Sequence, residues 1–460
     1  MARPFILLAS ALALTTALTQ PILAQTLVAT GGVTPNREGE LARPIRYTPD
    51  GDAFRIENGT ERYNRPLYGG NTAFRADGGD RPEFVLYLPG RGGNLRFAVR
   101  LADGTHWWLH EAEGITTHYR PGELTYRITD PRLGAGAIEL AAVALADTEG
   151  LAIHARGDGL AAGVQLAWAF GGVNGQRGTR DGDIGTEKVP ISEWFGFQPA
   201  FAQDNQAALL DNGFSLSGKP GTITGTVLHG GVIGTAPGET WDDPATLFAG
   251  PAIGTTPERP VMTGTLQLGD SGGFLVLQRT AYAPAANADL STYTAVSADR
   301  RAPPPLPPLG SAYAAETLPQ IFADARAHFA ALRGRVRIVT PDPWLNAATA
   351  SLNVAADAVW DGPQSAIMHG AVAWRTKLVG WRGPYALDAL GWHDRARANF
   401  RAWLPRQNTD PVPDAIPPAD SDSNLARNEA ALHSNGDLAN AHYDMNAVFV
   451  DALFRHIAWT

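Results

Sequence analysis

The fold is decided by the stretch Glu83–Asp130, EFVLYLPGRGGNLRFAVRLADGTHWWLHEAEGITTHYRPGELTYRITD. Its apolar and polar residues alternate in short runs that are separated by Gly, Pro and Asp-Gly turns, a pattern typical of antiparallel strands. The runs in this stretch are Glu83–Leu88, Leu95–Leu101, Ile115–Arg120 and Leu124–Thr129. Similar runs follow at Ile138–Leu145, Val164–Phe170, Ile223–Leu228 and Gly273–Arg279. We therefore predict an antiparallel β-sandwich over residues 26–297.

The composition changes at ADRRAPPPLPPLGSAY, Ala298–Tyr313, whose prolines can continue neither a sheet nor a helix. A helical pattern follows directly, with its apolar residues on one face. These residues are Ile321, Phe322, Ala325, Phe329 and Leu332. Residues 298–340 are therefore predicted to be a proline-rich linker with a connecting helix.

Helical periodicity continues to the end of the chain. Pro343 fits the first turn of a helix whose inward face is predicted to carry Trp344, Ala348, Leu352, Ala355 and Val359. A second helix is expected to begin at Pro384, bury Leu387 and Leu390, and end at Gly391. The next one carries Ala396, Phe400 and Trp403, and a last one after residue 440 is predicted to bury Val448, Leu453, Phe454 and Ile457.

Helices that alternate with long and short loops are typical of an (α/α) toroid built from helical hairpins. A six-hairpin ring needs twelve helices, and about four are visible here. Residues 341–460 are therefore predicted to be the first hairpins of an incomplete toroid, in a chain that is truncated at its C-terminus.

The N-terminus has the features of a secretory signal. Arg3 precedes an apolar run from Phe5 to about Leu18, and a stretch of small residues ends near Ala24. Residues 1–24 are predicted to be a signal peptide, which places the mature chain in the periplasm or outside the cell. No later segment has the length and apolarity of a membrane span, and the chain contains 0 cysteines.

The charge of the chain argues against a nucleic-acid partner. The sequence has 37 Lys and Arg against 46 Asp and Glu, and its basic residues form no cluster. We expect a poly- or oligosaccharide as the partner instead.

Reactive side chains gather at WRTKLVGWRGPYALDALGWHDR, Trp374–Arg395, and again at the start of the last helix. In a toroid, the starts of inner helices line the central pocket. The predicted pocket residues from the first region are His369, Arg375, Trp381, Arg382, Tyr385 and Asp388, and those from the second are His442, Tyr443, Asp444 and Asn446. Aromatic faces stack on sugar rings, and arginine forks bind carboxylates, so this composition indicates carbohydrate binding.

Two chemistries fit the predicted catalytic residues Tyr385, Tyr443, Asp388, Asp444 and His442. Asp388 or Asp444 could serve as the general acid or base of a hydrolase, which needs two carboxylates. Alternatively, a tyrosine or a histidine could abstract a proton beside a carboxylate in β-elimination, with Arg375 or Arg382 neutralising that carboxylate. His369, Arg375, Trp381, Arg382 and Asn446 are assigned to substrate binding.

Structural roles compete with these assignments. Trp374 and Trp392 fit core aromatics, and Asp394 fits a helix cap, so we divide the motif at Gly391 and assign Trp392, His393 and Asp394 to structure. Asp80 and Arg81 are expected to form a turn pair. No cofactor is predicted: the chain lacks a zinc signature, and a calcium loop at Asp181, Asp183 and Glu187 lacks the full ligand spacing.

Three stretches carry a family resemblance: RYNRPLYGGNTAFRADGGDRPEFVLYLPGRGGNLRF, MHGAVAWRTKLVGWRGPYALDALGWHDRARANFRAW and HYDMNAVFVDALFRHIAWT. They resemble secreted bacterial proteins, long without an assigned function, that join an N-terminal β-domain to a six-hairpin glycosidase-type toroid. The family is similar to lyases that remove the rhamnose capping α-1,4-linked glucuronic acid. The resemblance implies a tyrosine base, for which Tyr385 and Tyr443 are the matching residue types, and it implies several hundred further residues after position 460.

The function that the sequence favours is an extracytoplasmic enzyme that cleaves a uronate- and rhamnose-containing glycan, with β-elimination ahead of hydrolysis. The alternatives are a six-hairpin glycoside hydrolase that uses paired carboxylates and a non-catalytic glycan-binding fragment.

Overall fold

A computed structural model describes most of the β-region and part of the helical region. The described residues are 33–34, 43–44, 46–69, 74–88, 90–176, 190–249, 256–282, 309–362, 365–367, 384–404 and 445–460. The predicted signal peptide and residues 298–308 of the predicted linker lie outside these ranges. No helix within them combines the length and apolarity needed to cross a membrane.

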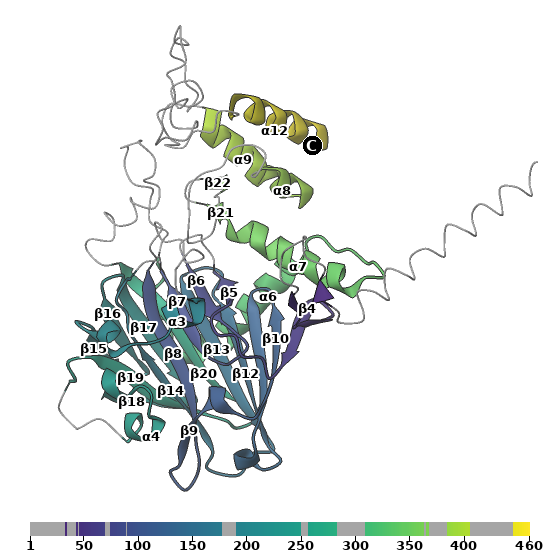
Figure 1. Ribbon diagram of the computed structural model, residues 1–460. Coiled ribbons are helices and arrows are strands. Elements are labelled where there is room, and N and C mark those ends of the chain that lie inside the picture. The colour runs from purple at the N-terminus through teal and green to yellow at the C-terminus, as the bar shows by residue number, and fades with distance from the viewer. Residues whose placement is uncertain are drawn as a thin grey trace, which may run out of the picture.

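Two antiparallel sheets form the N-terminal part of the molecule (Figure 1). The first has the strand order β15-β16-β17-β20-β13-β12-β11-β10-β4-β3. Its strands are β3 (Thr48–Asp50), β4 (Ala53–Glu57), β10 (Gly114–Arg120), β11 (Glu123–Thr129), β12 (Ala137–Ala144), β13 (Gly150–Asp158), β15 (Gln206–Leu210), β16 (Gly213–Gly218), β17 (Gly221–Leu228) and β20 (Gly273–Tyr282).

The second sheet has the order β18-β19-β14-β8-β7-β6-β5, and β9 pairs with β8. Its strands are β5 (Arg65–Tyr68), β6 (Arg75–Gly78), β7 (Phe84–Tyr87), β8 (Arg91–Arg100), β9 (His106–Trp108), β14 (Gln165–Gly171), β18 (Gly230–Pro237) and β19 (Pro260–Gln267). Two small ribbons pair β1 (Val33–Thr34) with β2 (Arg43–Pro44) and β21 (Trp360–Asp361) with β22 (Ala366–Ile367). Every strand predicted from the sequence overlaps one of the observed strands.

The two sheets pack face to face through aromatic side chains. Phe84 of the second sheet meets Tyr126 of the first edge-on, with ring centroids 6.1 Å apart. Trp168 stacks on Phe214 across the same interface at 5.4 Å. All four side chains are buried, and such pairs add to the free energy of apolar burial. The predicted antiparallel sandwich is therefore present, and its sheets stay open rather than closing into a barrel.

Short helices occupy the connections of the sandwich. They are η1 (Leu109–Glu111), η2 (Pro131–Leu133), α3 (Ile191–Trp194), η4 (Pro199–Ala202), η5 (Gly238–Thr240), α4 (Pro244–Leu247) and η6 (Ala315–Thr317). The longer helices follow the sandwich in the chain. They are α6 (Leu318–Arg333), α7 (Pro343–Ala358), α8 (Pro384–Ala389), α9 (His393–Trp403) and α12 (Met445–Trp459).

Helix α6 packs on the ten-stranded sheet along the predicted apolar face. Phe322 contacts the ring of Phe274 at 6.0 Å, and Phe329 lies over the β10–β11 turn at Gly122. The end of the helix is fixed by Arg333, whose Nε donates to Asp52 at 3.1 Å and whose Nη1 donates to the carbonyl of Pro121 at 2.9 Å. The connecting helix thus packs against the sandwich.

The face predicted for α7 is wrong. Leu352 is 66% exposed, and the buried positions are instead Ala347, Ala350, Asn353, Val354 and Ala358. Asn353 explains the rotation, because its side-chain amide donates to the carbonyls of Arg333 at 2.7 Å and Val336 at 2.9 Å. These carbonyls lie at the end of α6 and just beyond it, where backbone acceptors lack helical partners.

The predicted break between α8 and α9 is confirmed. Gly391 has φ +71°, a left-handed conformation that favours glycine, and its N–H donates to the carbonyl of Asp388 at 2.9 Å. Leu387 is buried, as are Ala396 and Phe400 on α9. Trp403 lies in α9, but its side chain is outside the described part.

The buried face predicted for α12 is wrong at two positions. Phe454 is 68% exposed and Ile457 is 67% exposed, whereas Ala452 and His456 are buried. The reason is the hydrogen bonding of His456, which faces α8 and binds Asp388 there. The side chain of Val448 lies outside the described part of the chain.

The helices α7, α8, α9 and α12 rise from one end of the sandwich (Figure 1). Helix α9 is joined to α7 by an ion pair between Arg395 and Asp357, with Nη1 and Oδ1 2.7 Å apart. The described helices do not establish a toroid, which stays a prediction.

Candidate functional site

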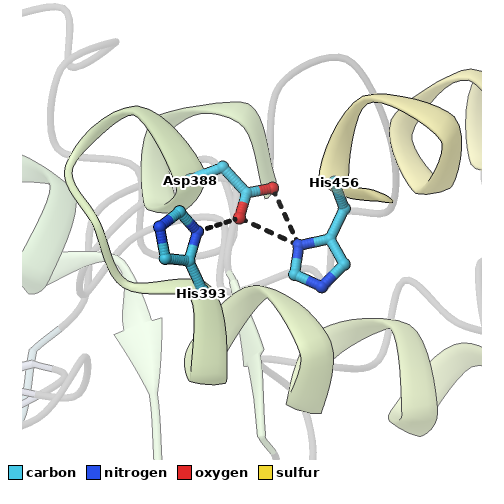
Figure 2. A group of neighbouring side chains, drawn as sticks. All are labelled: Asp388, His393 and His456. Atoms are coloured by element: carbon cyan, nitrogen blue, oxygen red, sulfur yellow. Dashed lines mark hydrogen bonds and ion pairs between the residues drawn. The ribbon is translucent and has the colours of Figure 1, made fainter. Parts of the chain in front are cut away.

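A buried carboxylate and two imidazoles meet between α8, α9 and α12 (Figure 2). The Oδ1 atom of Asp388 lies 3.0 Å from Nδ1 of His393 and 2.9 Å from Nδ1 of His456. The Oδ2 atom lies 3.2 Å from the same nitrogen of His456. We call these three residues the Asp388 cluster.

The local sequence explains how His393 reaches Asp388. The chain turns at Gly391, and the N–H of Trp392 donates back to the carbonyl of Leu387 at 2.7 Å. Helix α9 then begins at His393, so its first side chain returns to the end of α8. Five residues therefore separate two side chains that a continuous helix would hold on different faces.

His456 comes from a distant part of the chain and is positioned by packing. Phe400 of α9 lies 5.4 Å from the ring of His456 and 5.7 Å from Phe449. Ala452, one turn before His456, is fully buried, and its small side chain lets α12 approach closely. The cluster thus depends on the contacts of all three helices.

Buried apolar residues flank the cluster in the sequence. Leu387 precedes Asp388, Trp392 precedes His393, and Ala396 follows on α9. The nearby guanidinium groups of Arg335 and Arg395 lie over the ring of Trp392, at 4.5 Å and 4.7 Å from its centroid. Within the described part of the chain, the recorded partners of the Asp388 carboxylate are therefore the two imidazoles.

Two kinds of chemistry are open to this arrangement. A carboxylate that orients an imidazole is suited to proton transfer. The same oxygen and nitrogen donors are ligands for transition-metal ions. One ligand atom from each of the three residues lies within 4.8 Å of the other two.

Among the predicted site residues, Asp388 is the one whose side chain the structure describes. Tyr385 lies three residues earlier in α8, and Asn446 lies in the first turn of α12, but their side chains are outside the described part. Asn446 precedes His456 by ten residues, so the two positions are about 15 Å apart along α12. Asn446 is therefore separated from the Asp388 cluster.

The other predicted site residues cannot be placed. His369, Arg375, Trp381, Arg382, His442, Tyr443 and Asp444 lie outside the described residues, as do the calcium candidates Asp181, Asp183 and Glu187. Their roles, and the central pocket that the two helix starts are predicted to line, stay predictions.

Neither histidine of the cluster is among the predicted site residues. The division of the motif at Gly391 assigns His393 to structure, and no sequence pattern points to His456. The two neighbours of His393 agree with the structural roles predicted for them. Trp392 is buried, as expected of a core aromatic. Asp394 is exposed in the first turn of α9, and its Oδ1 lies 3.2 Å from Nη1 of Arg397. No local spacing signals a pairing between α8 and α12, because it arises only when the helices pack.

Asp80 and Arg81 do not form the predicted turn pair. Asp80 is fully buried and accepts hydrogen bonds from the Tyr47 hydroxyl, from Arg46 at 3.2 Å and from the N–H of Glu61 at 2.9 Å. Arg81 donates to backbone carbonyls, among them that of Gly59 at 2.7 Å. Both residues serve instead to fix the segment that joins β4 to β5.

A second buried carboxylate lies in the sandwich. Glu83 is held between Nε of Arg62 at 2.7 Å and Nε of Arg96 at 2.8 Å. Nδ1 of His110 lies 3.7 Å from the same carboxylate. Burial lowers the pKa of His110 to about 4, with Glu83 opposing the shift and Arg96 adding to it. The two guanidinium groups compensate the charge of Glu83 inside the sandwich, which indicates a structural role.

Comparisons with known proteins give limited information. A family model described as a domain of unknown function (DUF4450) matches residues 88–299. No curated protein matches the sequence. The region of the match lies mostly within the sandwich and does not include the Asp388 cluster.

Two solved structures have some likeness to the chain. One is a bacterial glucoamylase complexed with acarbose, at 10% identity and a TM-score of 0.40, over 78% of this chain and 51% of the other. The second is an inverting mannosidase of family GH92 from Bacteroides thetaiotaomicron VPI-5482, at 10% identity and a TM-score of 0.28, over 68% of this chain and 36% of the other. The chain thus spans about half of the glucoamylase and about a third of the mannosidase. Both names are those of glycosidases, and at these TM-scores neither likeness establishes the fold or the activity of this chain.

Proposed function

We propose that this chain is part of an extracytoplasmic carbohydrate-active enzyme that cleaves a uronate- and rhamnose-containing glycan by β-elimination. The proposal starts from the residue types around α8 and from the family resemblance of the sequence. The structural observation that supports elimination over hydrolysis is that the Asp388 carboxylate is buried and bound by two imidazoles.

A hydrolytic acid or base must place its carboxyl group against the glycosidic oxygen or the attacking water. Asp388 is only 5% exposed, and both of its oxygens lie within hydrogen-bonding distance of an imidazole nitrogen. It is therefore suited to positioning its histidine partners rather than to contacting a sugar. A pair of catalytic carboxylates that includes Asp388 is disfavoured for this reason.

β-Elimination needs a base and a cation rather than two free carboxylates. The base removes the proton from C5 of the uronate, the C4–C5 double bond forms, and the bond from C4 to the leaving oxygen breaks with its electron pair. The leaving oxygen takes up a proton, from the protonated base or from water, and departs as a hydroxyl group of rhamnose. In this proposal Tyr385, Tyr443 or His442 supplies the base, and Arg375 or Arg382 neutralises the carboxylate to stabilise the developing charge. Tyr385 precedes Asp388 by three residues, so the two positions are neighbours on α8.

Two other functions make different predictions. A glycoside hydrolase would use Asp444 with a second carboxylate other than Asp388. A glycan-binding fragment would retain affinity without cleaving the substrate.

The test is to incubate the purified chain with rhamnose-capped glucuronate glycans and with other acidic glycans. Elimination would release rhamnose and leave a 4,5-unsaturated uronate that absorbs ultraviolet light. Tyr385→Phe or Tyr443→Phe should abolish that absorbance, whereas Tyr313→Phe should retain it, because the hydroxyl of Tyr313 binds Asp147 of the sandwich. Release of reducing sugar without absorbance would support the hydrolase, and glycan binding without either product would support the binding fragment.

A further inference from the structure

We propose that Asp388, His393 and His456 bind a divalent transition-metal ion, with zinc as the ion that best fits the donors, and that they leave one coordination position open. This site goes beyond the proposed glycan cleavage and does not depend on it. It is built from one carboxylate oxygen and two imidazole nitrogens.

The donor types select the class of ion. Zinc is commonly bound by three protein ligands that combine histidine nitrogens with a carboxylate oxygen. Calcium and magnesium prefer oxygen ligands, which two imidazoles do not provide. The Asp388 cluster therefore fits a borderline-soft ion of the zinc type.

The distances agree with a shared ion. Ligand atoms about 2.1 Å from a tetrahedral zinc ion lie roughly 3.4 Å from one another. The Nδ1 atoms of His393 and His456 lie 3.0 Å and 2.9 Å from Oδ1 of Asp388, and the second contact of His456 measures 3.2 Å. All three ligand atoms lie within 4.8 Å of one another, and side-chain movements would have to bring the two nitrogens to the spacing of metal ligands.

The spatial origin of the ligands also favours an ion. The three ligands come from α8, α9 and α12, and both imidazoles present Nδ1 to the same carboxylate (Figure 2). A single hydrogen bond is enough to stabilise a buried histidine. A metal ion requires three or more ligands that meet at one point, and these three side chains meet in that way. Burial of Asp388 and His456 further strengthens the attraction between an ion and its ligands.

The three ligand side chains differ in their exposure to solvent, and this difference indicates where the open coordination position of the ion lies. The side chains of Asp388 and His456 are 5% and 7% exposed, whereas that of His393 is 37% exposed. The ion would therefore be reached from the side of His393. A water molecule or a substrate oxygen would complete its coordination there, as at catalytic zinc sites.

The experiment uses the full chain after treatment with a chelator and dialysis. Titration with zinc, followed by calorimetry, should reveal one site per chain, and the melting temperature should rise with zinc concentration. His393→Gln, His456→Gln and Asp388→Asn should each weaken binding by about tenfold or more. The matched control is His328→Gln, which removes an exposed histidine on α6 and should leave the affinity unchanged.

Absence of zinc binding by the folded wild-type chain would overturn the proposal, as would equal weakening by the control variant. Cobalt substitution of the wild-type chain gives a second test that does not require folded variants. An intense visible spectrum would indicate a four- or five-coordinate site with imidazole ligands. A weak octahedral spectrum would show surface binding only and would contradict the proposed site.

Discussion

Phe329 of α6 lies so close to Gly122 in the β10–β11 turn that a Cβ atom at position 122 would fall 2.3 Å from the phenylalanine ring. The helix therefore packs on the sheet at a point where the sheet has no side chain. This contact joins an element outside the sandwich to its ten-stranded sheet.

Gly122→Ala should destabilise the protein more than Gly104→Ala. Both glycines have similar left-handed conformations, with φ +89° and φ +87°, but no atom lies within 4 Å of a Cβ at position 104. The backbone strain is thus shared, and the difference in the free energy of unfolding should be about 1–3 kcal/mol from overpacking against Phe329. Urea denaturation measures this difference. Adding Phe329→Leu to Gly122→Ala should recover part of the loss, and equal effects of the two alanine variants would contradict the packing seen here.

His110 should make the stability of the sandwich depend on pH. Its pKa is about 6.5 in the unfolded chain and about 4 in the folded chain, so its contribution is fully present above pH 6.5. As the pH falls from 6.5 to 4, the unfolded state binds the proton more readily, and up to about 3 kcal/mol of stability is lost. Denaturant unfolding at a series of pH values should show this slope in the wild-type chain and a reduced slope in His110→Gln.

The buried carboxyl group of Asp77 changes the stability in the opposite direction over part of the same pH range. Burial raises the pKa of Asp77 to about 6, although Arg75 opposes the shift, so its contribution falls as the pH rises from 3.8 to 6. The comparison of His110→Gln with wild type cancels this contribution. His328→Gln is the control, and a wild-type slope that His110→Gln leaves intact would rule out the role assigned to His110.

Asp80→Asn should lower the free energy of unfolding by about 2–3 kcal/mol. The substitution replaces an acceptor oxygen with an amide that cannot accept all the hydrogen bonds from Arg46, Tyr47 and Glu61. Asp211→Asn, at an exposed position, should have little effect. The same denaturation assay measures both variants, and a stability of Asp80→Asn within about 0.5 kcal/mol of wild type would argue against a structural role of this carboxylate.

Asp388→Asn should lower stability by about 1–3 kcal/mol even with a chelator present, because the imidazoles of His393 and His456 lose carboxylate partners in a buried position. Asp394→Asn removes a nearby but exposed carboxylate and should change stability by less than about 0.5 kcal/mol. Thermal unfolding in chelator separates this loss from any effect of a metal. Equal melting temperatures for the two variants would show that the Asp388 cluster does not hold the helices together.

The sequence predicted the sandwich well where the strands alternate clearly, as in β10 and β11. The predicted runs leave out ten of the 18 strands of the two sheets, the central strands β13 and β19 among them. Two clear examples are β15, whose sequence QAALL lacks alternation and is largely exposed, and β18, whose glycines weaken the pattern. These strands are stabilised by pairing with neighbours, which local periodicity does not report.

The helical region shows a different limit. Apolar periodicity identified α7 and α12, but the orientation of each helix follows a polar contact: Asn353 binds carbonyls at the end of α6, and His456 binds Asp388. For the same reason the sequence predicts a role for Asp388 but does not predict its contacts with His393 and His456. Hydrophobicity predicts that a helix forms, whereas a buried polar side chain decides which way it faces.

The contact between Asp52 and Arg333 has a kinetic consequence. The two residues are 281 positions apart, and they join the hairpin at one edge of the ten-stranded sheet to the last turn of α6. Contacts of such sequence separation form slowly, because a long loop must close before they contribute any free energy. We expect the pair to form late in folding, so a spectroscopic probe placed across it would record the completion of the native state rather than its nucleation.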